Sequence, residues 1–130
     1  GYAIKLAINY GYIIGVITGG REINIKTRLE YLGVKEVFLG VHKKLPVLKE
    51  FLKHNKLKKE EVAYMGDDIP DLKALQYVGL SCCPEDAAND VKIICDYISS
   101  KKGGEGCVRD VIEQTLRINN QWNLDGEIKY

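Results

Sequence analysis

Residues 61–72 read EVAYMGDDIPDL, and they decide the fold class that we expect for this chain. The first five form a short, mainly apolar run, which is typical of a buried strand. Three aspartates follow within five residues, Asp67, Asp68 and Asp71. Pro70 lies where a helix can begin, because the first helical turn tolerates a residue without an N–H group. The stretch therefore predicts a strand, an acidic turn and a helix in direct succession.

The same alternation continues on both sides of this stretch. Short apolar runs predict further strands at residues 12–18, 37–39, 78–83 and 97–99. Helical spacing predicts helices at residues 22–32, 44–54, 70–77, 85–95 and 107–118, after a helix that ends at residue 9. Strands separated by single helices form right-handed βαβ units. We therefore expect one α/β domain over residues 1–130, with a doubly wound, Rossmann-like parallel sheet.

Bulk composition excludes several classes of partner. The 130 residues are 45% hydrophobic and 28% charged, with a net charge of +1, as in an ordinary globular protein. This charge gives no electrostatic argument for binding nucleic acid or an anionic membrane, and no apolar run is long enough to cross a bilayer. The four cysteines form no C-x-x-C pair. We expect a cytoplasmic protein with reduced core thiols, with a zinc site as a minor alternative.

In a doubly wound sheet, ligands bind beyond the carboxyl ends of the strands, so the residues that follow each strand are the informative ones. Thr18, Gly19, Gly20 and Arg21 follow the first predicted strand. A hydroxyl, two glycines that let backbone N–H groups approach an anion, and a cation suit a phosphate site. A plain strand-to-helix turn explains the same residues equally well.

The three aspartates of the acidic turn repel one another unless a cation neutralises them. Mg²⁺ suits such a place, because it takes one or two carboxylates and keeps several waters. Alternatively, Asp68 or Asp71 caps the helix at Pro70, which explains one aspartate but not three. After the strand at residues 37–39, Lys43 or Lys44 could reach toward a phosphate or the aspartates, and a solvated lysine is the alternative.

Residues 101–109, KKGGEGCVR, are the last candidate segment. Gly103 and Gly104, together with the bidentate fork of Arg109, could bind a phosphate or carboxylate. The alternative is a flexible loop before a helix that turns Arg109 to solvent.

Taken in order, Thr18, Lys44 and the GDDIPD of residues 66–71 resemble the second, third and fourth motifs of the haloacid dehalogenase superfamily. The chain as far as residue 122 resembles the small capless subfamily of phosphatases that act on 3-deoxy-D-manno-octulosonate 8-phosphate (Kdo-8-phosphate). The matching stretches are ITGGR (17–21), GVHKKL (40–45), VAYMGDDIPDL (62–72), VGL (78–80) and KGGEGCVRDVIE (102–113).

The resemblance implies a role for each candidate residue. Thr18 would hydrogen-bond the phosphoryl group, and Lys44 would neutralise its charge. Asp67 would bind Mg²⁺, while Asp68 and Asp71 would orient metal-bound water and Lys44. The residues implied at the substrate end are Gly19, Gly20, Arg21, Gly103, Gly104 and Arg109.

The resemblance also implies an activity. It is Mg²⁺-dependent hydrolysis of Kdo-8-phosphate through an aspartyl-phosphate, in lipopolysaccharide precursor synthesis, by a cytoplasmic homotetramer. Such a reaction depends on positioning and on neutralising spread negative charge, which Mg²⁺ and lysine supply.

Two departures from the subfamily affect this expectation. The family begins with a strand that ends in D-x-D, and no such motif precedes Thr18. We therefore expect an N-terminally incomplete domain that lacks the nucleophile and a central strand. The second departure is Gly20, where Kdo-8-phosphate phosphatases often have arginine and nonulosonate 9-phosphate phosphatases have glutamate.

Three alternatives remain open at this point. The first is a phosphatase for a nonulosonate 9-phosphate, and the second is a non-catalytic assembly module of the same fold. The third is a toprim-like magnesium domain, which the near-neutral charge disfavours.

Overall fold

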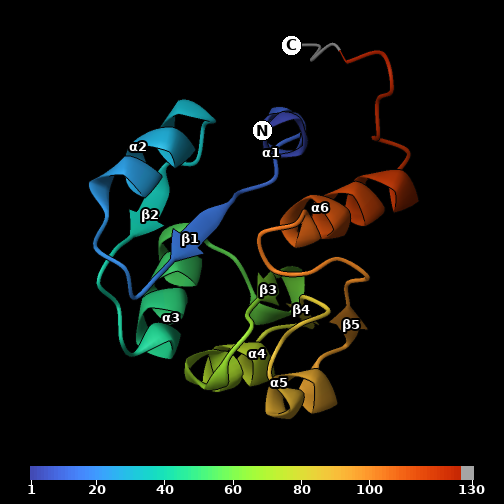
Figure 1. Cartoon of the computed structure of the whole chain (residues 1–130). Helices are drawn as coiled ribbons and strands as arrows, with labels where there is room; N and C mark the ends of the chain where they lie inside the picture. The colour runs from blue at the N-terminus through green and yellow to red at the C-terminus, as the bar shows by residue number, and fades with distance from the viewer. Residues whose placement is uncertain (127–130) are drawn as a thin grey trace. The chain divides into compact units, whose positions relative to one another are not determined.

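The computed structural model describes residues 1–126 of the chain. The chain forms two compact units, of which the first comprises residues 1–40 and the chain from Arg109 onward. The second comprises Val41–Val108. Both units contain parallel strands joined by helices, and each is considered in turn (Figure 1).

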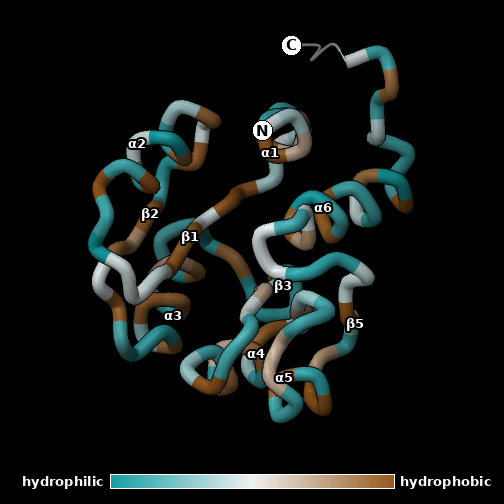
Figure 2. Tube along the Cα trace, viewed as in Figure 1, coloured by the Kyte–Doolittle hydropathy of each residue, from teal (hydrophilic) through white to brown (hydrophobic). Residues whose placement is uncertain are grey.

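The first unit holds a two-stranded parallel sheet. Its elements are α1 (Tyr2–Asn9), β1 (Gly15–Ile17), α2 (Ile23–Tyr31), β2 (Glu36–Phe38) and most of α6 (Cys107–Ile118). Val16 of β1 lies opposite Val37 of β2, and the tube at β1 is mainly hydrophobic in Figure 2. The core of this unit forms where Leu6 and Ala7 of α1 meet Leu116 of α6. An apolar α1 face therefore holds the two ends of the described chain together.

The second unit holds a three-stranded parallel sheet in the order β3-β4-β5. Its elements are α3 (Lys44–His54), β3 (Ala63–Met65), α4 (Leu72–Tyr77), β4 (Leu80–Cys83), α5 (Asn89–Ile94) and β5 (Tyr97–Ile98), with 3₁₀ turns η1 (Lys59–Glu61) and η2 (Ile69–Asp71). Leu75 of α4, Cys83 of β4 and Val91 of α5 form its core with Ala87. The sheet therefore presents the acidic turn directly after β3.

The prediction of core thiols is confirmed. All four cysteines are free; Cys82, Cys83 and Cys107 are buried, and Cys95 is half-buried. Burial raises the pKa of the Cys82 thiol to about 11, which keeps it protonated and unreactive at neutral pH. Among residues 1–126, no helix is sufficiently long and apolar to cross a membrane.

The parallel α/β class and the helices at residues 44–54 and 107–118 are confirmed. Several other elements are shorter than predicted, and for two of them backbone hydrogen bonds to other segments give the reason. The strand predicted from residue 12 begins at Gly15, because the Tyr12 N–H donates to the Ala7 carbonyl at the end of α1. The helix predicted from residue 85 begins at Asn89, because the Ala88 N–H donates to the Asp67 carbonyl.

Gly79 tests the packing between η1 and β4. An added Cβ would lie 2.6 Å from the carbonyl oxygen of Glu60 and 2.8 Å from its Cα, and these are backbone atoms that cannot rotate away. We expect Gly79→Ala to lower the free energy of unfolding by about 1–3 kcal/mol, measured by urea denaturation. Gly103→Ala is the matched control, because its nearest atom would be 3.5 Å away. Equal stability of the two variants would contradict this packing.

Candidate active site

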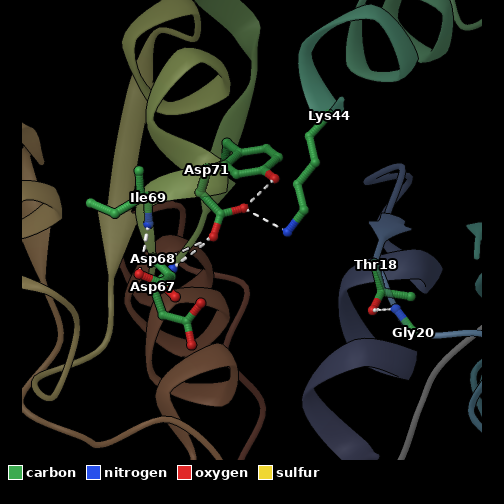
Figure 3. Close-up of polar contacts among 8 residues, drawn as sticks. Thr18, Gly20, Lys44, Asp67, Asp68, Ile69 and Asp71 are labelled. Carbon is green, nitrogen blue, oxygen red and sulfur yellow. Dashed lines mark hydrogen bonds and ion pairs between the residues drawn. The ribbon is translucent and has the colours of Figure 1, made fainter. Parts of the chain in front are cut away.

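Asp71 is the centre of the site in the second unit. Its side chain is only 4% exposed. Oδ1 accepts hydrogen bonds from the Tyr64 hydroxyl at 2.8 Å and from Lys44 Nζ at 2.9 Å. Oδ2 accepts from the backbone N–H groups of Asp67 at 3.0 Å and Asp68 at 3.3 Å (Figure 3). The buried carboxylate is therefore fully hydrogen-bonded, by four donors from β3, α3 and the acidic turn.

Local sequence explains how Asp71 reaches this position. Gly66 directly follows β3, and any Cβ there would overlap Cβ and Cγ of Asp71. Asp68 caps η2 by accepting the Ile69 N–H at 2.8 Å, and Pro70 occupies the first turn, where its missing N–H costs nothing. The glycine, the cap and the proline together let the carboxylate of Asp71 approach the N–H groups of the acidic turn.

Two opposing effects set the pKa of Asp71. Burial by itself raises the pKa, but hydrogen bonds from Lys44 and Tyr64, the Lys44 charge and the Asp67 N–H bring it below its ordinary value. Burial raises the pKa of the Tyr64 phenol, and the Asp71 charge adds to that rise. The Tyr64 hydroxyl therefore remains a donor at every physiological pH.

Asp67 is held by its backbone and keeps its carboxylate in solvent. Its N–H donates to Asp71, and its carbonyl accepts the Ala88 N–H at 3.0 Å. An exposed carboxylate on a fixed backbone fits Mg²⁺, which takes few protein ligands and keeps waters. Within residues 1–126, no three acidic, histidine or cysteine side chains gather as a metal site. A magnesium ion at Asp67 would therefore complete its coordination from other oxygen donors.

Two alternatives left open by the sequence are resolved here. Of the two adjacent lysines, Lys44 binds Asp71, whereas Lys43 is exposed at the start of α3. Asp68 acts as the helix cap, and a further role in orienting metal-bound water stays a prediction. Asp71 is more than a cap, because its carboxylate binds the lysine as well as the turn.

Thr18, Gly20, Arg21 and Gly40 lie together in the first unit. The Gly20 N–H donates to Thr18 Oγ1 at 3.1 Å (Figure 3), and the Gly40 N–H donates to the Gly20 carbonyl at 2.8 Å. Gly40 has a φ of 66°, and a Cβ there would lie 3.2 Å from Cζ of Arg21. A backbone hydrogen bond thus joins the loops that follow β1 and β2. The Thr18 hydroxyl still has its own proton to donate, because the Gly20 bond uses it as an acceptor.

The glycine loop before α6 is hydrogen-bonded to the segment that follows β4. The Gly103 N–H donates to Asp86 Oδ1 at 2.7 Å, and the Glu85 N–H donates to the Lys101 carbonyl at 2.9 Å. Gly104 has a φ of 78°, a conformation that favours glycine. Gly103 and Gly104 therefore lie on an ordered loop, and their contact with a substrate stays a prediction.

Arg109 contacts the segment that follows α6. Its guanidinium lies 5.7 Å from the centroid of the Trp122 ring, as does that of Arg117. Arg109 Nε is also 3.8 Å from a carboxylate oxygen of Glu113. The Arg109 side chain is 64% exposed and keeps donors for other partners. Its role at the substrate end stays a prediction.

Sequence reasoning missed Tyr64 and Asp86. A tyrosine within an otherwise apolar strand, two residues before Gly66, was the available signal for Tyr64, because a buried hydroxyl requires a partner. No local pattern marked Asp86, because its partner Gly103 is 17 residues further along the chain.

Comparisons with known proteins agree on one family. The family model for haloacid dehalogenase-like hydrolases matches residues 32–112. The chain is 32% identical over 116 residues to the 3-deoxy-D-manno-octulosonate 8-phosphate phosphatase KdsC of Escherichia coli (strain K12). This match covers 89% of the chain and 62% of the relative, so the chain spans about three fifths of the relative's length.

Solved structures show the same likeness. The Kdo-8-phosphate phosphatase of Yersinia pestis matches with a TM-score of 0.89 and 31% identity, over 92% of this chain and 64% of that one. The enzyme of Moraxella catarrhalis, solved with a magnesium ion, a phosphate ion and a KDO molecule, matches with a TM-score of 0.88 and 31% identity. That match covers 91% of this chain and 68% of the other. The expected α/β fold of this family is thereby confirmed.

The Lys44–Asp71 pair should make stability depend on pH. Because the folded-state pKa of Asp71 is lowered, its carboxylate stabilises the fold above the unfolded pKa of about 3.9, and this is lost as the pH falls through the folded value. We expect Lys44→Met to lower the free energy of unfolding by about 2 kcal/mol at pH 7, because the buried carboxylate loses its cation. The deficit should shrink below about pH 4.

Urea denaturation between pH 7 and pH 3, with a chelator present, measures this dependence. Lys53→Met, an exposed lysine of the same helix, is the control. A Lys44→Met deficit that stays constant across this range would contradict the assigned interaction.

Proposed function

The chain belongs to the haloacid dehalogenase-like hydrolase family, and we propose that it carries most of the active site of a magnesium-dependent sugar-phosphate phosphatase. The proposed reaction hydrolyses Kdo-8-phosphate to Kdo and phosphate through an aspartyl-phosphate, in lipopolysaccharide precursor synthesis. One observation carries the proposal: buried Asp71 binds both the Lys44 ammonium and the backbone of Asp67. The similarity to the Escherichia coli 3-deoxy-D-manno-octulosonate 8-phosphate phosphatase, at 32% identity, supports the substrate class.

The proposed roles follow from the donors and charges of the chain. Thr18 would donate its hydroxyl proton to a phosphoryl oxygen, since its lone pair already serves Gly20. Lys44, held by Asp71, would place an ammonium beside the phosphoryl group. Asp67 would hold Mg²⁺, which when bound neutralises charge on the transferring group. Asp68 would keep the acidic turn closed through its cap.

A carboxylate nucleophile is also needed, and residues 1–17 contain no aspartate. The chain spans 62% of the Escherichia coli relative. We therefore assign the attacking aspartate and the general acid of the proposed reaction to a part of the protein outside these 130 residues. Residues 1–130 would then form an incomplete haloacid dehalogenase-like domain.

The proposed assembly is a homotetramer, and its proposed compartment is the cytoplasm. The four free thiols support a reducing environment. Light scattering of the full-length protein would measure the assembly directly.

Asp67→Asn tests the proposed metal ligand. The change keeps the backbone bonds of Asp67 but removes the charge that Mg²⁺ requires. In the full-length protein, we expect Mg²⁺-dependent phosphate release from Kdo-8-phosphate to fall on the order of 100-fold or more. Asp90→Asn is the control, because Asp90 is an exposed acid on α5. Wild-type rates in Asp67→Asn would show that the site is misplaced.

The same assay judges the function as a whole. If the wild-type full-length protein releases no phosphate from Kdo-8-phosphate or from a nonulosonate 9-phosphate, the proposed function fails. Release from the second substrate alone would favour the alternative that Gly20 leaves open.

Arg21→Ala tests the substrate end. The guanidinium of Arg21 lies next to Gly40, in the loops that follow β1 and β2. The carboxylate of a sugar acid would be a suitable partner for its two parallel N–H donors. We expect KM for Kdo-8-phosphate to rise about tenfold, with a smaller change in kcat. Arg28→Ala, at an exposed arginine of α2, is the control. An unchanged KM would remove Arg21 from the substrate site.

A further inference from the structure

The Tyr64 hydroxyl donates to Asp71. Neither the sequence analysis nor the proposed function gives Tyr64 a role. It lies on β3, opposite Ser81 of β4, and its hydroxyl lies 2.8 Å from Asp71 Oδ1. The Tyr64 ring packs on the core of the second unit, against the cluster of Leu75, Cys83, Ala87 and Val91. The sheet and the core therefore fix the hydroxyl in space, independently of the acidic turn.

Tyr64 and Lys44 share a single oxygen atom. The hydroxyl at 2.8 Å and the ammonium at 2.9 Å both donate to Oδ1 of Asp71, while two backbone N–H groups occupy Oδ2. With the Asp71 side chain only 4% exposed, water has little access to replace a lost donor. Loss of the hydroxyl would therefore leave the ammonium as the only donor to Oδ1.

This sharing determines how strongly and in which direction Asp71 holds Lys44. A carboxylate oxygen that already accepts a hydrogen bond from a hydroxyl group attracts an ammonium less strongly than one that accepts no other hydrogen bond. An ammonium has three N–H donors, and the Asp71 bond uses one of them. The geometry thus both anchors Lys44 and leaves two of its donors for an anion.

We propose that Tyr64 is a positioning residue for phosphoryl transfer, whose hydroxyl shares Oδ1 of Asp71 with Lys44 and so aims the ammonium at the phosphoryl group. This inference rests on the proposed function. Tyr64 itself touches no reacting atom in this scheme and acts through Asp71 and Lys44.

Steady-state kinetics of the full-length protein test the positioning. Tyr64→Phe keeps the ring in the core and removes only the hydroxyl. We expect kcat to fall roughly tenfold while KM changes by less than about twofold, because a misaimed ammonium weakens the transition state more than substrate binding. Tyr77→Phe is the matched control, because Tyr77 contacts Lys49 and Lys59 through its ring and not through its hydroxyl.

A double-mutant cycle on unfolding tests the sharing without any enzyme assay. We expect the effects of Tyr64→Phe and Lys44→Met on the free energy of unfolding to be non-additive, because both remove a donor from one oxygen. Tyr77→Phe and Lys44→Met should be additive. If Tyr64→Phe does not fold, Tyr64→Met enters the same measurements as a second variant without the hydroxyl.

The outcomes separate this inference from the proposed function. An active wild type with unchanged kcat in Tyr64→Phe overturns the positioning role and leaves the function standing. A raised KM with unchanged kcat, or an additive cycle, also overturns it. A wild type inactive on both sugar phosphates overturns the function and the positioning role together.

Discussion

The structure of the second unit depends on the burial of one negative charge. A carboxylate removed from water is tolerated only when it is paired and hydrogen-bonded. Asp71 meets this condition with a cation from α3, a hydroxyl from β3 and two backbone N–H groups of the acidic turn. Satisfying this charge brings Lys44 and the backbone of Asp67 to one place, so the same constraint that shapes the turn also assembles the candidate site.

Backbone hydrogen bonds help to hold two of the groups proposed to meet the substrate, Asp67 and the Thr18 loop. Asp67 is bonded at both its N–H and its carbonyl, which leaves its carboxylate free for a cation. Thr18 is bonded to the loop it begins, and that loop is bonded to Gly40. Phosphoryl transfer is served mainly by such preorganised charges and donors, because the protein has little covalent chemistry to contribute.

Much of the fold and part of the site could be predicted because their signals are local. Alternating apolar runs and helical spacing marked nearly every element, and the resemblance to a phosphatase family rested on short motifs around Thr18, Lys44 and residues 66–71. Element ends were less predictable. Tyr12 and Ala88 use their N–H groups on Ala7 and Asp67, and such bonds to neighbouring segments are invisible in a linear pattern.

The sequence by itself determined the parallel α/β class, the acidic turn after β3 and the residue types that are proposed to meet phosphate and magnesium. Only the tertiary structure showed that Lys44 binds Asp71 directly, that Asp71 is the buried aspartate, and that Tyr64 and Asp86 are hydrogen-bonded to candidate residues. The physical reason is the separation along the chain over which each kind of effect acts. Propensity and spacing act over a few residues, whereas Asp71 meets Lys44 across 27 positions, and Gly103 meets Asp86 across 17.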